Sequence, residues 1–461
     1  QQLKTVTLKA ERGDIYDCNG KVLATSATVW TVYIVPKNFD NDTEKARLVA
    51  DGLAEILELD ADSVYEQTQK NTAYEKVKSK IEQPEADKVR KFVTENKVGS
   101  IVGLESSIKR YYPNGSMAST VLGFVGDDNQ GLSGIEYQYD SELEGVPGKL
   151  VASKNAQGGD MPFNYETMVE ATPGGSIKLT IDEYVQHICE KYLDEAVTAN
   201  SATNRGCAVV MNVKTGEIVG MATKPDFDPN EPFTLYSDTD KKTIDDLTAS
   251  SADQKEISAK RTELLEAQWK NKAITDTYEP GSVFKIITGS AAVEEKKATM
   301  SSSFNCPGYI VIAGTRYNCH QLSGHGAQTF INIFENSCNP AFVTMGLKIG
   351  TQAYYKYLKS FGLMEATGID LPGEAEGIFA GEDSFNSNVV SLAAYSFGQT
   401  FNVTPLELIR AQAATINGGY LYTPYLVEQV LDDEGNVISQ HEPQAVRQVI
   451  SEETSAKVRE C

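Results

Sequence analysis

The sequence predicts an α+β fold in two domains, and three observations support this prediction. Short runs that alternate apolar and polar residues around glycine turns are typical of strands, whereas longer runs with apolar residues at helical spacing are typical of helices. A length of 461 residues suits two or three domains of about 150 residues each. Glycine and proline concentrate between residues 150 and 176. We therefore expect an N-terminal domain over 1–170 and a second domain over 171–461.

The composition excludes several classes of protein. Apolar residues make up 41% of the chain and charged residues 23%, which is typical of a folded globular protein. The 64 Asp and Glu residues outnumber the 42 Lys and Arg residues, so the formal net charge is −22 and no nucleic-acid partner is expected. No apolar run reaches the ~18 residues of a membrane-spanning helix. The seven cysteines include no CxxC pair, so they leave the redox compartment undecided.

The N-terminal half opens with a strand pattern. From Arg12 onward apolar and polar residues alternate around Asn19-Gly20, which predicts a hairpin. Residues 43–58 and 84–96 then carry apolar residues at helical spacing among many charges, which predicts two surface helices.

The second half opens with a helix pattern that Asp182 can cap. We expect its apolar face to pack on a sheet, and that face carries Val185, Ile188, Tyr192, Leu193 and Ala196. Two apolar strands over 207–223 follow, joined at Lys214-Thr215-Gly216. The polar stretch 237–272 is expected to be a partly helical insertion on the surface.

A serine and a lysine three positions apart are the first candidate for chemistry. Ser282 and Lys285 follow Pro280-Gly281 at the start of an apolar run, so one helix face would present both side chains. Burial can lower the pKa of a lysine enough for its amine to take a proton from a serine hydroxyl. The alternative is a helix cap with a solvated lysine. Ser106 and Lys109 have the same spacing but no helix-start signal, so context distinguishes the two pairs.

A second candidate lies at Ser337-Cys338-Asn339, where one apolar helix is expected to end and Pro340 to begin the next. A Ser-x-Asn corner between helices can point into a cleft. The alternative is helix capping by Asn339, and the same pattern recurs at 303–305 and 384–386.

Ser-x-x-Lys followed 55 residues later by Ser-x-Asn is the order found in penicillin-binding proteins and serine β-lactamases. The chain resembles a class B penicillin-binding protein of the division or sporulation type over nearly its whole length. The stretches that carry the resemblance include RGDIYDCNGKVLATS, GLSGIEYQYDSELEGVPGK, MNVKTGEIVGMATKPDFDPN, YEPGSVFK and SFGQTFNVTPLELIRAQAATINGG. Departures from the family pattern include Cys18, Thr400 and Glu407, where Arg, Gly and Gln are common.

The resemblance implies the fold and the location of the protein. It implies an N-terminal pedestal domain of the dimerisation type, followed by a penicillin-binding transpeptidase domain similar to serine β-lactamases, with an antiparallel sheet flanked by helices. It also implies an extracytoplasmic protein anchored to the cell membrane by an N-terminal helix. The chain starts at Gln1 without that helix.

The resemblance also implies a function, peptidoglycan D,D-transpeptidation in cell-wall synthesis. Ser282 would attack the penultimate D-Ala of a stem peptide ending in D-Ala-D-Ala, and Lys285 would take its proton. Ser337 would relay a proton to the leaving amine, and Asn339 would hold the peptide and orient Lys285. β-Lactam antibiotics would acylate the same serine, no cofactor would be required, and a membrane glycosyltransferase would be a partner.

Two other functions remain open. A β-lactam-binding sensor or a β-lactamase-like hydrolase would use the same Ser-Lys chemistry but has little need of a pedestal. A non-catalytic scaffold of a cell-wall complex would keep the fold without the chemistry, although the intact Ser282, Lys285, Ser337 and Asn339 argue against it.

Four side chains suited to zinc lie around the Ser-x-Asn motif, namely Cys306, Cys319, His325 and Cys338. Three thiolates and one imidazole would close a tetrahedral structural zinc site. The alternatives are a Cys306–Cys319 disulfide and free buried thiols.

The third motif of the family, Lys-Thr-Gly or Lys-Ser-Gly, does not occur after Ser337. The Lys-Thr-Gly at 214–216 precedes Ser282 and sits between two apolar strands, so we interpret it as a hairpin turn. Residues 451–461 resemble the helix that usually precedes the missing strand. The sequence therefore predicts a chain truncated before the Lys-Thr-Gly strand, with doubtful activity of its own.

Overall fold

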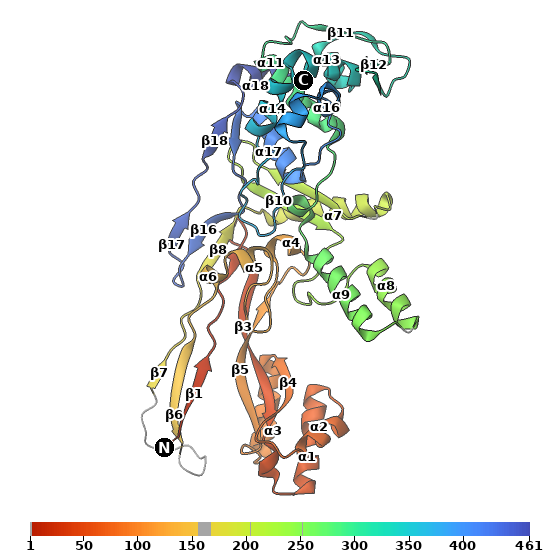
Figure 1. Ribbon diagram of the computed structural model, residues 1–461. Coiled ribbons are helices and arrows are strands. Elements are labelled where there is room, and N and C mark those ends of the chain that lie inside the picture. The colour runs from red at the N-terminus through yellow and green to blue at the C-terminus, as the bar shows by residue number, and fades with distance from the viewer. Residues whose placement is uncertain (1, 155–166, 203, 251) are drawn as a thin grey trace.

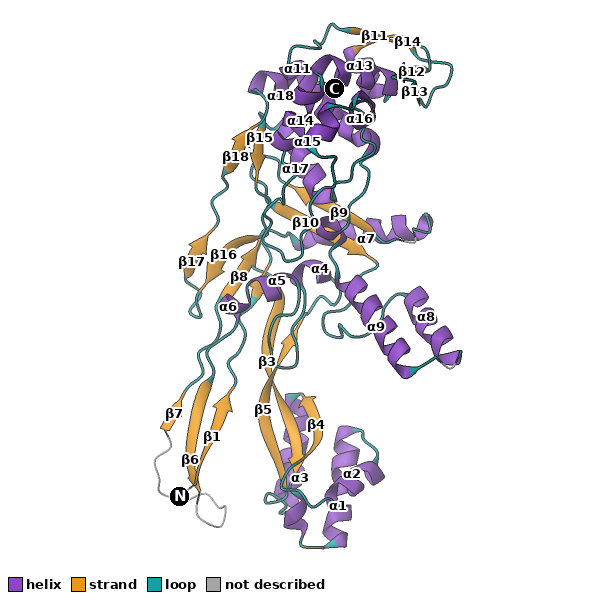
Figure 2. Cartoon of the chain, in the orientation of Figure 1, coloured by secondary structure: helices purple, strands orange, loops and turns teal. Residues whose placement is uncertain are grey.

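The computed structural model describes residues 2–154, 167–202, 204–250 and 252–461. Figure 1 shows an elongated molecule whose N-terminal half forms two arms and whose C-terminal half forms a largely helical lobe at the opposite end. Figure 2 shows strands along both arms, helices at the end of one of them, and mostly helices in the lobe. The mixture of helices and sheets agrees with the predicted α+β class.

A twisted antiparallel sheet forms one arm. The long strand β3 (Val22–Ile34) pairs with β4 (Glu75–Ile81) and with β5 (Val102–Tyr111). Helices pack against this sheet, and their bounds are α1 (Thr43–Leu57), α2 (Ala61–Thr68) and α3 (Gln83–Glu95), with a 3-10 turn at Pro36–Phe39. The two predicted helices are confirmed as α1 and α3, whereas α2 was not anticipated.

The predicted hairpin around Asn19-Gly20 is also confirmed. The short strand β2 (Ile15–Tyr16) pairs antiparallel with β3, and Gly20 takes a positive φ of 83° in the turn between them. β2 also pairs in parallel with β8 (Ser176–Leu179), which in turn pairs with β16 (Val427–Leu431). The sheet therefore joins segments from both ends of the chain.

The other arm is an antiparallel sheet of β1 (Gln2–Leu8), β6 (Gly148–Lys154) and β7 (Thr167–Val169). The predicted boundary segment 150–176 includes residues 155–166, which lie outside the described residues. Short helices near the base of both arms are α4 (Ser119–Leu122), α5 (Gly134–Gln138) and α6 (Asp140–Leu143).

The second half begins with helix α7 (Glu183–Ala199), which Asp182 caps by accepting from two backbone N–H groups. The helix packs on the antiparallel hairpin of β9 (Gly206–Met211) and β10 (Ile218–Lys224). Both the cap and the hairpin agree with the sequence prediction.

The packing face of α7 differs from the predicted one. Tyr192 is 59% exposed and Ile188 is 36% exposed, and Ala196 is exposed as well. The residues that meet the strands at Gly206 and Gly220 are Val185, Cys189, Leu193 and Val197.

Polar side chains explain why the helix is rotated. Gln186 donates to the Met221 carbonyl at 2.9 Å and accepts from the Met221 N–H at 2.8 Å. Glu190 accepts from the Ala118 N–H at 2.7 Å. Both side chains are buried with their hydrogen bonds satisfied, and an apolar periodicity cannot anticipate such positions.

The insertion predicted over 237–272 forms a helical hairpin of α8 (Asp238–Ala249) and α9 (Gln254–Trp269), followed by α10 (Lys272–Thr275). Helix α8 buries none of its residues, which agrees with a surface insertion. Figure 1 shows the hairpin projecting from the body of the molecule.

The C-terminal lobe packs around a core that includes Phe284, Phe342, Tyr395 and Phe401. Its helices are α11 (Lys285–Glu294), α12 (Phe330–Glu335), α13 (Asn339–Ile349), α14 (Thr351–Ser360), α15 (Glu382–Asn386), α16 (Val389–Tyr395), α17 (Pro405–Ile416) and α18 (Glu452–Val458). Its strands are β11 (Ser303–Cys306), β12 (Tyr309–Ile312), β13 (Thr315–Asn318), β14 (Gly326–Thr329), β15 (Tyr420–Tyr422) and β18 (Ala445–Gln448). Strand β17 (Val437–Gln440) lies outside the lobe and pairs with β16 at the edge of the sheet that contains β8.

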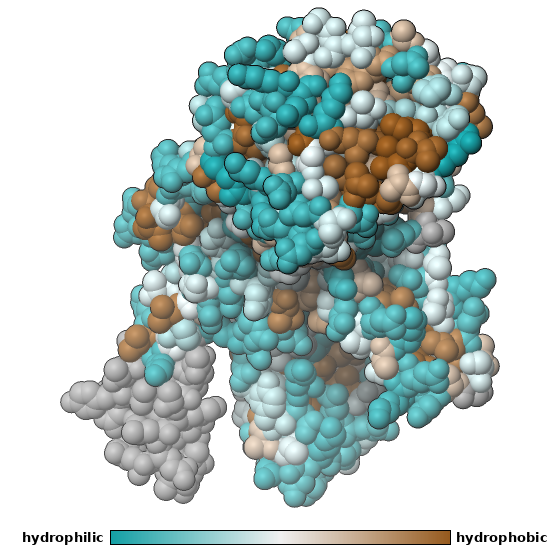
Figure 3. Space-filling view, turned by 45° about the horizontal axis from the view of Figure 1, so that its top comes forward, coloured by the Kyte–Doolittle hydropathy of each residue, from teal (hydrophilic) through white to brown (hydrophobic). Residues whose placement is uncertain are grey.

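The surface of the molecule is mostly hydrophilic on the face shown in Figure 3, with hydrophobic side chains gathered on the upper part. Among the described residues, no helix combines the length and the apolar composition needed to cross a bilayer.

Candidate active site

Ser282 lies in a 3-10 turn (Gly281–Phe284) that leads directly into helix α11. Gly281 takes a positive φ of 63°, and its N–H donates to the Gly398 carbonyl at 2.7 Å. Ser282 is exposed, whereas Lys285, one turn later, is only 3% exposed. The predicted helix start is confirmed, and it places an accessible hydroxyl above a buried amine.

Ser337 and Asn339 occupy the corner between α12 and α13. Ser337 has a positive φ of 44°, and Asn339 is the first residue of α13. Cys338, not Asn339, is the N-cap of α13, and its side chain makes no capping bond. The capping alternative for Asn339 is therefore wrong.

The amine of Lys285 brings these residues together. Its Nζ lies 3.1 Å from Ser282 Oγ, 2.9 Å from Ser337 Oγ, 2.8 Å from the Ser337 carbonyl oxygen and 2.7 Å from Asn339 Oδ1. Asn339 Nδ2 donates to the Asn318 carbonyl at 3.0 Å, which fixes the amide so that Oδ1 faces the lysine. All four predicted site residues thus meet at one nitrogen atom.

The hydrogen-bond inventory favours proton exchange at this nitrogen. The Ser337 carbonyl and Asn339 Oδ1 can only accept, so they take two N–H groups of Lys285. A neutral amine has two N–H donors and one lone pair. The lone pair then faces the two hydroxyls and can accept the proton of Ser282.

Burial increases the fraction of Lys285 that is in the neutral amine form near physiological pH. Removal of Lys285 from water lowers its pKa to about 8, against a smaller opposing effect of the Cys338 and Cys319 thiols. A lysine in water titrates near ~10.4, so it would be almost entirely protonated at neutral pH. The site therefore supplies a base that an exposed lysine could not provide.

Residues 398–403 pack against the segment that precedes Ser282, and the sequence did not identify this contact. Tyr278 and Val403 exchange two N–H to carbonyl bonds of 3.0 Å, and the N–H of Thr400 donates to Glu279 Oε1 at 3.0 Å. Thr400 has a positive φ of 71°, at a position where the family pattern has Gly. That departure from the family pattern was the only indication in the sequence that residues 398–403 lie beside Ser282.

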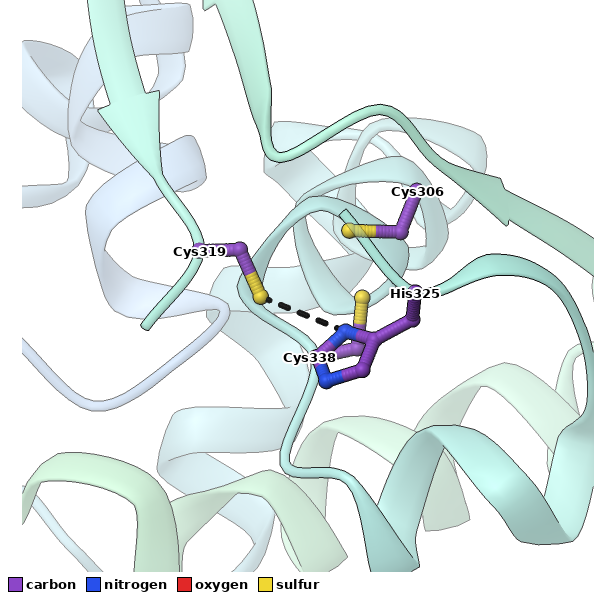
Figure 4. Close-up of side chains that lie close together, drawn as sticks. All are labelled: Cys306, Cys319, His325 and Cys338. Atoms are coloured by element: carbon purple, nitrogen blue, oxygen red, sulfur yellow. Dashed lines mark hydrogen bonds between the residues drawn. The ribbon is translucent and has the colours of Figure 1, made fainter. Parts of the chain in front are cut away.

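The four predicted metal ligands converge beside the Ser-x-Asn corner, as Figure 4 shows. Cys306 ends β11, Cys319 follows β13, His325 precedes β14, and Cys338 precedes α13. Their ligand atoms all lie within 4.8 Å of one another, and Cys319 Sγ is 3.5 Å from His325 Nδ1.

The chemistry of this cluster fits a structural zinc ion. Three sulfurs and one imidazole nitrogen are the donor set of a closed tetrahedral site. Burial raises the pKa of the Cys338 thiol to about 12, so without a cation this thiol stays protonated. The cysteines are free in this structure, Cys306 and Cys319 included.

The other two matches to the family motifs, Lys214-Thr215-Gly216 and the pair Ser106 and Lys109, lie elsewhere in the fold. Lys214-Thr215-Gly216 is the turn between β9 and β10, where Gly216 has a φ of 84° and Thr215 donates to Glu217. Ser106 and Lys109 lie on strand β5, so their spacing does not place them on a helix face. Context distinguishes the true pair from its copy, as the sequence analysis predicted.

A serine and a buried lysine at a helix start, facing a Ser-x-Asn corner, define the class of penicillin-recognising serine proteins. The chain belongs to the penicillin-binding proteins. Residues 206–461 match the penicillin-binding protein transpeptidase domain, and residues 7–179 match the penicillin-binding protein dimerisation domain.

Curated relatives agree with this assignment. The chain is 36% identical over 458 residues to stage V sporulation protein D of Bacillus subtilis, covering 99% of this chain and 65% of that protein. It is 26% identical to the peptidoglycan D,D-transpeptidase FtsI of Escherichia coli K12, covering 93% of this chain and 66% of that protein. The chain thus spans about two thirds of the length of these relatives.

Solved structures share the fold. A peptidoglycan synthetase from Bifidobacterium adolescentis matches with a TM-score of 0.70 and 26% identity, over 99% of this chain and 81% of that one. Penicillin-binding protein 2X from Streptococcus thermophilus matches with a TM-score of 0.77 and 23% identity, over 99% of this chain and 66% of that one. The family and the fold expected from the sequence are confirmed.

Proposed function

We propose that this chain carries the acyl-transfer site of a serine-type peptidoglycan D,D-transpeptidase. The observation that supports it best is the position of Lys285 Nζ, within 3.1 Å of Ser282 Oγ and held by Ser337 and Asn339. The named activity of FtsI and the family match support the same reaction.

In the proposed reaction, the neutral amine of Lys285 takes the hydroxyl proton while Ser282 Oγ attacks the penultimate D-Ala carbonyl of a stem peptide. The peptide C–N bond breaks, the leaving D-Ala amine takes a proton through Ser337, and an acyl-enzyme remains. An amine of a neighbouring stem then attacks the acyl carbon, the C–Oγ bond breaks, and Ser282 regains a proton. A β-lactam acylates Ser282 by the same first step.

The wider assignment rests on the relatives. Stage V sporulation protein D and FtsI suggest a role in sporulation or division, and peptidoglycan as substrate implies an extracytoplasmic site. We propose a membrane-anchored protein that works with a glycosyltransferase.

Intact-mass spectrometry after incubation with penicillin tests the function. A transpeptidase gives a stable adduct that proteolysis locates at Ser282. An adduct that disappears quickly with release of hydrolysed penicillin would indicate a β-lactamase-like hydrolase. No adduct at all on a full-length version would favour the non-catalytic scaffold.

The pH dependence of acylation follows from Lys285. Burial disfavours the ammonium and lowers the pKa to about 8, so the reactive neutral form increases as pH rises through that value. We expect the acylation rate to rise about tenfold per unit below pH 8 and to level off above it. Stopped-flow acylation by a fluorescent penicillin, with circular dichroism at each pH as a control, measures this profile. A flat profile between pH 6 and 9 would rule out Lys285 as the titrating base.

We also propose that Cys306, Cys319, His325 and Cys338 hold a structural zinc ion. When bound, zinc would tie the ends of β11, β13 and β14 to the start of α13. Elemental analysis of the purified protein is expected to give about one zinc per chain, and Cys306→Ser to give far less and a lower unfolding midpoint. Cys461→Ser is the matched control because Cys461 is exposed and outside the cluster. Metal-free protein with thiols that all react would indicate free thiols, and a mass two hydrogens lower would indicate the disulfide.

A further inference from the structure

The segment that leads into Ser282 is held rigidly against residues 398–403. Tyr278 pairs with Val403, and the Gly281 N–H donates to the Gly398 carbonyl at 2.7 Å. The backbones are so close that a Cβ on Gly398 would lie 2.0 Å from the Gly281 carbonyl oxygen. Side chains on these two segments therefore have fixed positions relative to the nucleophile.

Glu279 lies in the middle of this pair of segments. Its Oε1 accepts the Thr400 N–H at 3.0 Å, and both residues are exposed. Thr400 has to adopt a φ of 71° to make this bond, a conformation that is costly for a β-branched residue. Within the part of the chain that the structure describes, Thr400 is the only hydrogen-bond donor that meets the carboxylate, so Glu279 Oε2 has no protein donor there.

The backbone of Glu279 is close to the nucleophile in the chain. Glu279 and Ser282 are three residues apart, so their Cα atoms are separated by at most about 10 Å. Other charges nearby are already paired or buried: Asp276 accepts from Lys272 at 2.6 Å, and Lys285 is 3% exposed. Glu279 is therefore the carboxylate available to a ligand at this edge of the site.

We infer that Glu279, held by the Thr400 N–H, binds the ammonium of the acceptor amine and so favours aminolysis of the acyl-enzyme over hydrolysis. This inference rests on the proposed function. The acceptor ammonium releases one proton to solvent, its nitrogen attacks the acyl carbon, and the neutral amine of Lys285 takes a second proton from that nitrogen. The C–N bond forms as the C–Oγ bond of Ser282 breaks, and the Ser282 oxygen takes up a proton from Lys285. The net products are the amide, free Ser282 and one proton.

A carboxylate at this position suits the acceptor amine. An alkyl amine arrives as a cation at neutral pH, so a fixed negative charge raises its concentration beside the acyl carbon. Water has no net charge and gains nothing from Glu279.

Product partition is the test. The full chain is acylated with a thioester donor that ends in a D-alanyl group, and amide and acid products are counted by mass spectrometry. One acceptor is Nα-acetyl-lysine amide, whose side-chain ammonium is its only charge, and the other is hydroxylamine, which is uncharged near pH 7.5. With the lysine acceptor, Glu279→Gln is expected to lower the ratio of amide to acid about fivefold. With hydroxylamine the ratio should stay the same.

The salt dependence of the product ratio and a matched control variant test whether the charge of Glu279 is responsible. Added NaCl should lower the ratio for the cationic acceptor in the wild type but not in Glu279→Gln, because salt screens an exposed charge pair. Glu256→Gln on α9 makes the same change of charge away from the site and should have no effect.

The outcomes separate this inference from the proposed function. If Glu279→Gln lowers the ratio of amide to acid equally for both acceptors, the residue is only structural and the inference is wrong. The inference is also wrong if the ratio changes for neither acceptor. If the wild type forms no acyl-enzyme with the donor, the proposed function fails and the inference fails with it.

Discussion

Replacing Lys285 with methionine is expected to slow acylation of Ser282 by penicillin about 10³-fold. Methionine fills a similar volume, but it cannot accept the hydroxyl proton, and it leaves the Ser337 carbonyl and Asn339 Oδ1 without their donor. The measurement is the time course of labelling by a fluorescent penicillin, resolved by electrophoresis.

Arginine at the same position separates the two roles of the lysine. Lys285→Arg keeps a cation and several N–H donors, but a guanidinium does not give up its proton in proteins. We expect Lys285→Arg to acylate almost as slowly as Lys285→Met. Labelling near the wild-type rate would show that Lys285 acts only as a hydrogen-bond donor and that another group takes the proton.

The second Ser-x-x-Lys of the chain provides the matched control. Lys109→Met alters the same motif on strand β5, where Ser106 and Lys109 do not share a helix face. Its labelling rate should equal that of the wild type. Unfolding midpoints of all three variants show whether a lost rate reflects lost chemistry or lost structure.

The proposed catalytic pair could be found from the sequence because its signals are local. Pro280-Gly281 marks a helix start, and a spacing of three residues then places Ser282 and Lys285 on one face. The Ser337-Cys338-Asn339 corner was predicted from its position between two apolar helix patterns. The distances among these residues depend on how α11 and α13 pack, which no local pattern contains.

Long-range hydrogen bonds account for what the sequence could not predict. The predicted α7 face was right for Val185 and Leu193 but wrong for its other three residues, because Gln186 and Glu190 are buried against the backbone of Met221 and Ala118. Glu279 was missed because its partner is 121 residues away. The four possible metal ligands were found by residue type, but only the structure shows that they lie within 4.8 Å of one another.

The pedestal contains a buried charge network that the sequence also did not reveal. Glu136 on α5 accepts from Arg12 Nε, from Arg110 Nε at 2.7 Å and from the Tyr112 hydroxyl at 3.2 Å. The side chains of Arg12 and Glu136 are 0% exposed and that of Arg110 is 1% exposed. One carboxylate thus pairs with two buried guanidinium groups that come from distant parts of the chain, and Asp140 pairs with Arg12 as well.

Glu136→Ala is expected to lower the free energy of unfolding of the pedestal by about 3–5 kcal/mol. The cost arises because Arg12 and Arg110 stay charged and buried after their shared partner is removed. Arg12 still has Asp140 at 2.6 Å, which limits the loss on its side, whereas Arg110 keeps only oxygen atoms of neutral groups. Urea unfolding followed by circular dichroism measures the change.

Two further variants test whether the loss of stability in Glu136→Ala comes from the unpaired buried charges. Glu136→Gln keeps the shape and one acceptor oxygen but removes the charge, so it should fall between the wild type and Glu136→Ala. Asp127→Asn removes the partner of Lys80 in a pair whose aspartate is 93% exposed, and such a surface pair should contribute little. If Glu136→Ala were no more destabilising than Asp127→Asn, the two arginines would have to find water or other acceptors in the variant.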